Sequence, residues 1–230
     1  MDANHSLYKS AKAPLPDVLF KETIVPKLNG FSSRNPNTTV IIVPSLKDIF
    51  HDYVFPQPAY YGFELAERIK LLPNPCTFML NEITFTISTN DILFHLSGEE
   101  ISRSSVPSMD RVSRLCRHLL SQRRYEVSIN HSIYPLFPPS REANIDFSAA
   151  NGLNMDFTPD ILILPSSLRF FAKTVEKTIC INPGQMAKKN SPGTFSKLTI
   201  HPIPRSQIPD DECDMASFVH QRTRVEILRI

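Results

Sequence analysis

Two short apolar segments, each ended by a proline, constrain the fold of this chain more than any other feature of its sequence. Val40–Val43 is a run of four β-branched apolar residues that stops at Pro44. Ile161–Leu164 follows the same pattern and stops at Pro165. Such runs favour short buried strands, and proline ends a strand because it has no N–H for the ladder. Since α/β folds place ligands at the carboxyl ends of central strands, we expect any functional site in the two loops that follow.

The rest of the sequence predicts one clear helix and many short strands. The helix spans about 110–125, because Asp110 is a good N-cap and apolar residues recur at helical spacing after it. A second helix fits 16–28, where Pro26 weakens its last part. Strands are predicted at 76–80 and 83–87, joined as a hairpin at 81–82, and at 91–96, 178–181, 194–200 and 225–228. This pattern indicates a layered α/β or α+β fold, a β-sandwich flanked by helices.

Composition limits the class of protein. The chain carries a net charge of +2, which neither demands nor excludes a nucleic-acid partner. Its four cysteines show no C-x-x-C pair, so we expect reduced thiols in an intracellular protein rather than disulfides or a zinc site. We find no apolar run near 18 residues, as a membrane span would need. The proline-rich segment 55–61 is expected to be an extended surface loop.

Basic residues gather on one face of the helix predicted at 110–125. They are Arg111, Arg114, Arg117, Arg123 and Arg124. Such a face could meet DNA phosphates. Because the whole chain is nearly neutral, we interpret it instead as a solvated face with a modest positive field.

No familiar catalytic motif is present. The histidines at positions 5, 51, 95, 118, 131, 201 and 220 show no metal-binding spacing. There is no phosphate-binding loop, dinucleotide fingerprint or nucleophile elbow. The residues alone therefore identify no nucleophile with a base beside it.

Several motifs together resemble the family of B subunits of eukaryotic DNA polymerase alpha–primase. They occur in that family's order and cover nearly the whole chain. They are Asp2–His5, Val43–Asp48, Tyr53–Pro58, Asn90–Leu96 with Glu99–Ser102, Leu119–Arg123, Tyr134–Pro139, Pro159–Ser166 and Asn182–Gly184.

The resemblance implies a calcineurin-like metallophosphoesterase fold that is catalytically degenerate. Active relatives bind two metals through Pro-Gly-Asn-His-Asp and Gly-His-x-His motifs after strands. Leu46 and Lys47 stand within the first motif here, and Ser166 and Leu168 within the second. None of these four supplies the hard oxygen or imidazole ligands expected there. The remaining candidates are Asp2, His5, Asp48 and His95, and we expect them to be ordinary polar residues, with no catalytic, metal or cofactor site.

The implied function is that of a non-catalytic accessory subunit. It would scaffold the polymerase alpha–primase complex in the nucleus for the initiation of DNA replication. Its partners would be the C-terminal domain of the catalytic subunit and, through the complex, the primase subunits, with DNA contact indirect or weak and no membrane. Two alternatives remain open: a metal-dependent phosphodiesterase, and a nucleic-acid-binding module that uses the 111–124 helix.

The resemblance also predicts the domain organisation. Residues 1–204 would form the phosphodiesterase-like domain, and 205–230 an acidic loop and closing strand of the same domain. Residues 126–133 look like an insertion. The family carries an N-terminal region and an oligonucleotide/oligosaccharide-binding domain ahead of this one, so an N-terminally truncated form is expected.

Overall fold

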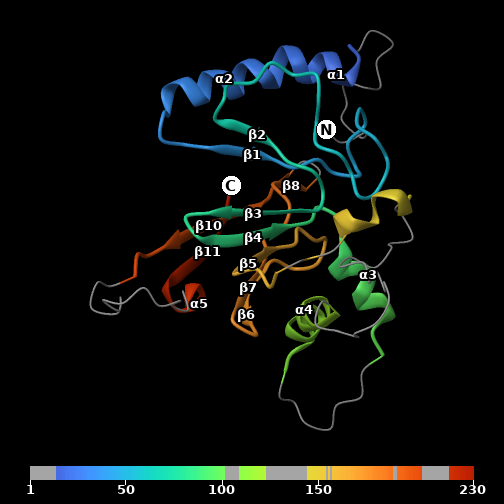
Figure 1. Cartoon of the computed structure of the whole chain (residues 1–230), viewed down its shortest axis with the longest axis vertical. Coiled ribbons are helices and arrows are strands. Elements are labelled where there is room, and N and C mark those ends of the chain that lie inside the picture. Colours follow the sequence, from blue (N-terminus) through green and yellow to red (C-terminus); the bar gives the residue numbers. More distant parts are fainter. Residues whose placement is uncertain are drawn as a thin grey trace. The chain divides into compact units, whose positions relative to one another are not determined.

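The computed structural model describes residues 14–101, 109–122, 144–153, 155, 157–188, 191–203 and 218–230. The chain divides into two compact units, Met1–Cys76 with Arg141–Gly152, and Thr77–Ser140 with Leu153–Ile230 (Figure 1). Both contain helices and strands, so the predicted mixed α/β class is confirmed. Within the ranges given above, no helix combines the length and apolar character that a membrane span requires.

The described part of the first unit begins with a long helical segment. It consists of α1 (Pro16–Leu19), a π-helical turn η2 (Phe20–Ile24) and α2 (Val25–Arg34). The helix predicted at 16–28 is therefore confirmed and continues to Arg34. Pro26 lies in the first turn of α2, just after the π-helical turn, where its missing N–H and its ring disturb the helix least.

An aromatic cluster packs against this helical segment. The Phe20 ring centroid lies 5.2 Å from that of Phe50, 5.8 Å from Tyr60 and 4.8 Å from Phe63. The segment 55–61 is not the surface loop expected from its prolines, because Phe55 and Gln57 are almost completely buried. The prolines restrict the backbone but leave the side chains between them free to fill the core. A short 3-10 helix, η3 (Phe147–Leu153), follows in the sequence.

The strand predicted at 40–43 exists, but its place in the fold differs from the prediction. β1 (Val40–Ile42) pairs in parallel with β2 (Ile69–Leu71), and in the described part of the chain these two form a separate, half-buried sheet. The two proline-ended strands therefore do not share one sheet, and β1 is not a central strand. An apolar run favours a strand but does not determine which strand pairs with it.

The second unit contains a five-stranded sheet in the order β3-β4-β5-β7-β6. These strands are β3 (Cys76–Leu80), β4 (Ile83–Ile87), β5 (Ile161–Ile163), β6 (Phe171–Val175) and β7 (Thr178–Asn182). β4, β5 and β7 run parallel, and β6 returns antiparallel to β7. Asn81 and Glu82 have φ values of 48° and 64°, as a tight two-residue hairpin turn requires, so the predicted hairpin is confirmed.

A two-stranded ribbon covers one face of this sheet. β10 (Thr194–Ile200) pairs antiparallel with β11 (Thr223–Arg229), which confirms the two predicted strands, and α5 (Val219–Arg222) precedes β11. Leu198 and Val225 of the ribbon pack against a cluster centred on Ile161 and Ile181. The short strands β8 (Ala187–Lys188) and β9 (Ser191–Pro192) lie between the sheet and the ribbon in the sequence. Because side chains alternate along a strand, Leu162 and Cys180 point to the opposite face.

Two helices complete the second unit. α4 (Arg111–Gln122) confirms the predicted helix as far as Gln122, and the last predicted residues lie outside the described ranges. The strand predicted at 91–96 is wrong, because this segment is the helix α3 (Ile92–Glu99). Asp91 caps α3 by accepting a hydrogen bond from the backbone N–H of Phe94 at 3.2 Å. The short apolar run after Asp91 fits a helix or a strand, and only the capping residue distinguishes them.

Candidate functional site

The loop after β1 is organised by the carboxylate of Asp48. This carboxylate accepts a hydrogen bond from the backbone N–H of Ser45 at 2.8 Å and another from the Tyr60 hydroxyl. Burial and the neighbouring carboxylate raise the pKa of Tyr60 far above its usual range. Asp48 therefore serves the local loop, in which Lys47 is exposed to solvent.

Gln57 also stabilises the loop after β1 by hydrogen bonds. Its side chain is 1% exposed and donates to the carbonyl oxygens of Ser45 at 3.1 Å and Asp52 at 3.0 Å. Its backbone exchanges two hydrogen bonds with Asn74, at 2.6 and 2.9 Å. The buried polar groups of Gln57 thus find hydrogen-bond partners within the protein.

The loop after β5 is organised by a second carboxylate, that of Asp91. It accepts hydrogen bonds from the Ser166 hydroxyl, and from the N–H and hydroxyl of Ser167 at 2.7 Å each. Burial alone would raise the pKa of Asp91, but these hydrogen bonds and the one from Phe94 outweigh burial and lower the pKa. Both serine hydroxyls therefore donate hydrogen bonds to the carboxylate of Asp91.

Asn182, at the end of β7, fixes this loop from the other side. Its carbonyl oxygen accepts from the N–H groups of Ser166 at 3.0 Å and Gly184 at 2.9 Å. Its amide donates to the carbonyl oxygens of Leu168 at 3.1 Å and Arg169 at 3.3 Å. Asn182 is completely buried, so one side chain locks the loops that follow β5 and β7 together.

The structure describes two of the four predicted candidate ligands, Asp48 and His95. Asp2 and His5 lie outside the described ranges. Asp48 lies in the first unit, and His95 lies on α3 in the second. No cluster of three or more His, Cys, Asp and Glu side chains able to hold a metal occurs among the residues that the structure describes. The expected absence of a metal site stays a prediction.

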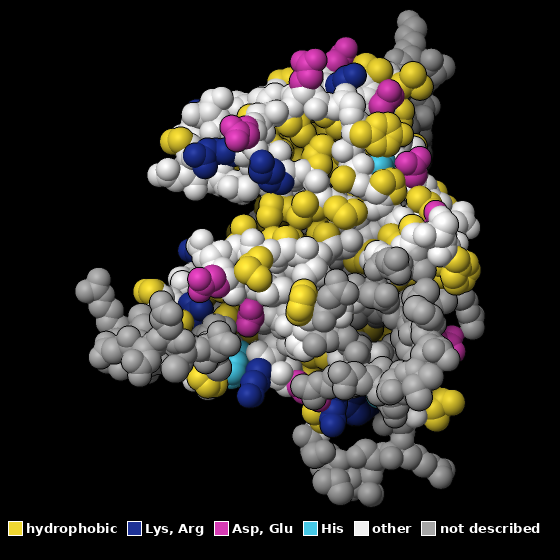
Figure 2. All heavy atoms as spheres, viewed as in Figure 1, with side chains coloured by type: hydrophobic (Ala, Val, Ile, Leu, Met, Phe, Trp, Pro, Cys, Tyr) yellow, Lys and Arg dark blue, Asp and Glu magenta, His cyan; other side chains and the backbone are white. Residues whose placement is uncertain are grey.

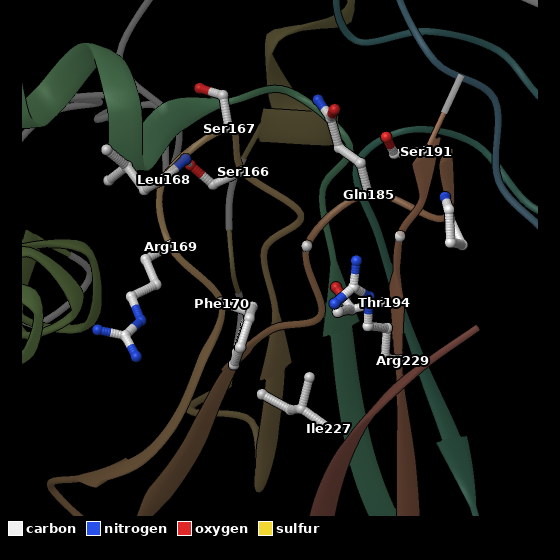
Figure 3. A pocket seen from close by; sticks show the side chains of 13 residues that line it. Ser166, Ser167, Leu168, Arg169, Phe170, Gln185, Ser191, Thr194, Ile227 and Arg229 are labelled. Carbon is white, nitrogen blue, oxygen red and sulfur yellow. Dashed lines mark hydrogen bonds between the residues drawn. The ribbon is translucent and has the colours of Figure 1, made fainter. Parts of the chain in front are cut away.

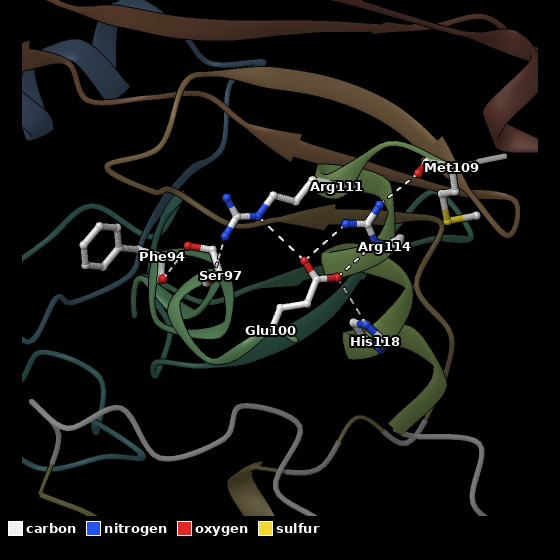
Figure 4. A network of polar contacts seen from close by, with 7 residues as sticks. All are labelled: Phe94, Ser97, Glu100, Met109, Arg111, Arg114 and His118. Carbon is white, nitrogen blue, oxygen red and sulfur yellow. Dashed lines mark hydrogen bonds and ion pairs between the residues drawn. The ribbon is translucent and has the colours of Figure 1, made fainter. Parts of the chain in front are cut away.

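On the described part of α4, basic side chains gather around the carboxylate of Glu100 (Figure 4). Glu100, whose side chain is 7% exposed, accepts from Arg114 at 3.0 and 3.4 Å, and lies 3.7 Å from both Arg111 and His118. Arg114 is the main reason that the pKa of Glu100 is lowered. Arg117 pairs with Glu176 at 3.3 Å. Arg111, Arg114 and Arg117 thus each lie beside an acidic side chain, although Arg111 and Arg117 remain more than half exposed, and Arg123 and Arg124 lie outside the described ranges.

Known proteins resemble this chain over most of its length. Residues 1–173 match the family model that describes the B subunits of DNA polymerases alpha and epsilon. The chain belongs to this family. The B subunit of DNA polymerase alpha from Mus musculus is 35% identical over 213 residues, which are 90% of this chain and 34% of the relative.

Fungal members of the family are similar over the same region. The polymerase alpha B subunit of Schizosaccharomyces pombe is 35% identical over 100% of this chain, and that of Saccharomyces cerevisiae is 28% identical over 92%. The chain covers 40% and 34% of the lengths of these two relatives. It therefore spans well under half of the B subunits that it resembles.

Proposed function

We propose that this chain acts as a non-catalytic accessory B subunit of DNA polymerase alpha–primase and scaffolds the complex for the initiation of replication. The observation that carries the proposal is the match to B subunits of DNA polymerase alpha over nine-tenths or more of the chain in animal and fungal relatives. Its partners would be the C-terminal domain of the catalytic subunit and, through the complex, the primase subunits. Its place of action would be the nucleus.

The proposed fold is a calcineurin-like phosphoesterase whose catalytic site has degenerated. Parallel strands β4, β5 and β7 with polar loops at their carboxyl ends support this assignment. A dinuclear site needs several oxygen or imidazole ligands that converge on open positions. The residues present do not fit such a pair of metals, because Ser166 and Ser167 bind the Asp91 carboxylate and Asp48 binds Ser45 and Tyr60.

The DNA contact of this subunit would be indirect or weak. The arginines of α4 support this view, since Arg111, Arg114 and Arg117 all lie against acidic side chains. On the face shown in Figure 2, the described Lys and Arg side chains lie among acidic ones rather than in one continuous track. Strong binding to a nucleic-acid backbone would need an extended basic surface.

Co-expression with the C-terminal domain of the polymerase alpha catalytic subunit tests the proposal. We expect the two chains to co-elute in size-exclusion chromatography as a stoichiometric complex that survives moderate salt. The catalytic subunit without that domain is the control and should elute separately. If the C-terminal domain eluted separately from this chain, as the catalytic subunit without that domain should, the scaffolding function would be contradicted.

A further inference from the structure

A pocket of about 710 Å³ lies in the second unit, where the loops after β5 and β7 face the β10–β11 ribbon (Figure 3). One wall is the loop 166–170 after β5, and another is formed by Gly184 and Gln185 after β7. The segment 191–194, together with Ile227 and Arg229 of β11, closes the far side. The pocket thus lies at the carboxyl ends of two adjacent parallel strands, the usual position for ligands in open α/β sheets.

The walls of this pocket are held rigidly. Asn182 hydrogen-bonds both loops, as described above. Gly193 approaches the backbone of Gln185 and Met186 so closely that a Cβ atom would overlap the Gln185 carbonyl oxygen. Thr194 donates its hydroxyl to the carbonyl oxygen of Pro183 at 2.7 Å, which joins β10 to the loop after β7. A pocket that is already formed loses little free energy to ordering when a ligand binds.

The chemistry of the lining favours a ligand with both acidic and apolar groups. Arg169 and Arg229 are exposed, and the described residues that line the pocket include no Asp or Glu. Among the described residues, neither guanidinium has a hydrogen-bond or ion-pair partner, whereas the arginines of α4 are paired. The Phe170 ring is 44% exposed, with the Arg169 guanidinium carbon 5.9 Å from its centroid. Ile227 adds an aliphatic side chain to the lining.

We propose that this pocket recognises an acidic peptide segment of a partner protein. An apolar side chain of the peptide would lie between Phe170 and Ile227, and its carboxylates would pair with Arg169 and Arg229. Arginine binds carboxylates through two parallel hydrogen bonds, which gives both affinity and specificity. A nucleic acid fits less well, because two guanidinium groups beside a discrete apolar pocket do not form a basic track. This inference rests on the pocket alone and stands whether or not the chain scaffolds the polymerase.

The test measures binding of a short fluorescein-labelled peptide by anisotropy to the whole chain. The peptide carries a Leu-Phe pair flanked on both sides by Asp and Glu. We expect saturable binding that weakens about tenfold, equivalent to ~1.4 kcal/mol, in Arg229→Ala and in Arg169→Ala. Phe170→Ala should weaken it to a similar extent. Arg224→Ala is the matched control, because Arg224 is an exposed arginine of β11 outside the pocket that pairs with Glu226, and it should bind as the wild type does.

Two further ligands test whether binding depends on the acidic charge of the peptide and whether a nucleic acid can replace the peptide. The same peptide with Asn and Gln in place of its acids should bind at least tenfold more weakly, since the guanidinium groups then lose their charged partners. A single-stranded oligonucleotide should not displace the acidic peptide at equal concentration. Equal binding by the Arg229→Ala and Arg224→Ala variants, undetectable binding of the acidic peptide at millimolar concentration, or displacement by the oligonucleotide would each overturn the proposal. Loss of peptide binding leaves the co-elution test of scaffolding unaffected, so the two can fail separately.

Discussion

Ser166 donates its hydroxyl to the carboxylate of Asp91, and this hydrogen bond ties the loop after β5 to the N-terminus of α3. The two residues are 75 positions apart in the sequence. The same carboxylate caps the helix through Phe94 and accepts two hydrogen bonds from Ser167. Asp91 therefore connects the sheet to the helical layer of the second unit.

Replacing Asp91 should be strongly destabilising. Asp91→Ala removes the helix cap, worth about 1 kcal/mol, and hydrogen bonds to a charged group, worth roughly 1.5–3 kcal/mol each before the loop relaxes. We expect a loss of about 2–4 kcal/mol in the free energy of unfolding, measured by urea denaturation. Asp17→Ala is the control, because Asp17 is an exposed first-turn acid in a helix without a side-chain cap, and it should change stability by less than about 0.5 kcal/mol. Equal effects of the two variants would argue against the role of Asp91.

Two glycines of the second unit should respond in opposite directions to the same change. A Cβ at Gly193 would collide with the backbone of Gln185 and lie 2.6 Å from the carbonyl carbon of Met186, so Gly193→Ala should lower the melting temperature. Gly98 lies in α3, and apart from its chain neighbours and the nearby helix backbone no described heavy atom lies within 4 Å of the position that an added methyl group would take. Gly98→Ala should therefore be neutral or stabilise by up to about 1 kcal/mol, the difference in helix propensity. Differential scanning fluorimetry measures the melting temperatures of both variants. A melting temperature of Gly193→Ala equal to that of the wild type would refute the close approach of Gly193 to the Gln185 backbone.

Local sequence signals predicted much of the second unit correctly. The hairpin at 76–87, the helix at 111–122 and the strands of the β10–β11 ribbon each carry their own pattern of apolar residues, turn residues or caps. The errors arose where short segments fit more than one structure, as at α3, or where pairing depends on distant residues, as for β1. The burial of the segment 55–61 also depends on tertiary contacts that its prolines do not encode.

The candidate site was harder to predict than the fold. The motifs identified the loops after β1 and β5, and both prove to be rich in internal hydrogen bonds. The residues that hydrogen-bond to the loop after β5 could not be predicted. Asp91 and Asn182 are distant from Ser166 in the sequence, and only the folding of the second unit brings them beside it. The pairing of Glu100 with Arg114 was missed for a similar reason, since it joins two helices through their packing. The pocket beside Arg229 combines four segments that are distant in the sequence and carries no local signature.

The stability of this protein should depend on pH through Glu100. Its pKa is lowered chiefly by the hydrogen bond from Arg114, so the folded state binds the proton less readily than the unfolded chain. The resulting stabilisation is fully present above the unfolded pKa of about 4.3 and is lost as the pH falls through the lower folded value. Melting temperatures measured downward from pH 6 should fall more steeply for the wild type than for Glu100→Gln. If the melting temperatures of the two proteins fell in parallel with pH, Glu100 would not contribute to the pH dependence of stability.

The basic face of α4 should contribute no specific affinity for primed template DNA. Because Arg111 and Arg117 already pair with acidic residues, we expect only weak binding that disappears with added salt. Arg117→Gln should change the Kd by less than about twofold at physiological salt, as expected for a surface ion pair of small net value. Fluorescence anisotropy with a labelled primer–template measures this. Submicromolar binding at that salt, lost in Arg117→Gln, would favour a nucleic-acid-binding function.

The loops after β1 and β5 should not support metal-dependent hydrolysis. Leu46 supplies no ligand atom, and the ammonium group of Lys47 would repel a divalent cation. Ser166 and Ser167 already bind Asp91, and Asp48 already binds Ser45 and Tyr60. We therefore expect no hydrolysis of bis-p-nitrophenyl phosphate above the metal-only rate when manganese is added, and no stoichiometric manganese, zinc or iron by elemental analysis. Bound metal near one equivalent, with hydrolysis that Asp48→Ala abolishes while Asp52→Ala does not, would establish a phosphodiesterase in place of an accessory subunit.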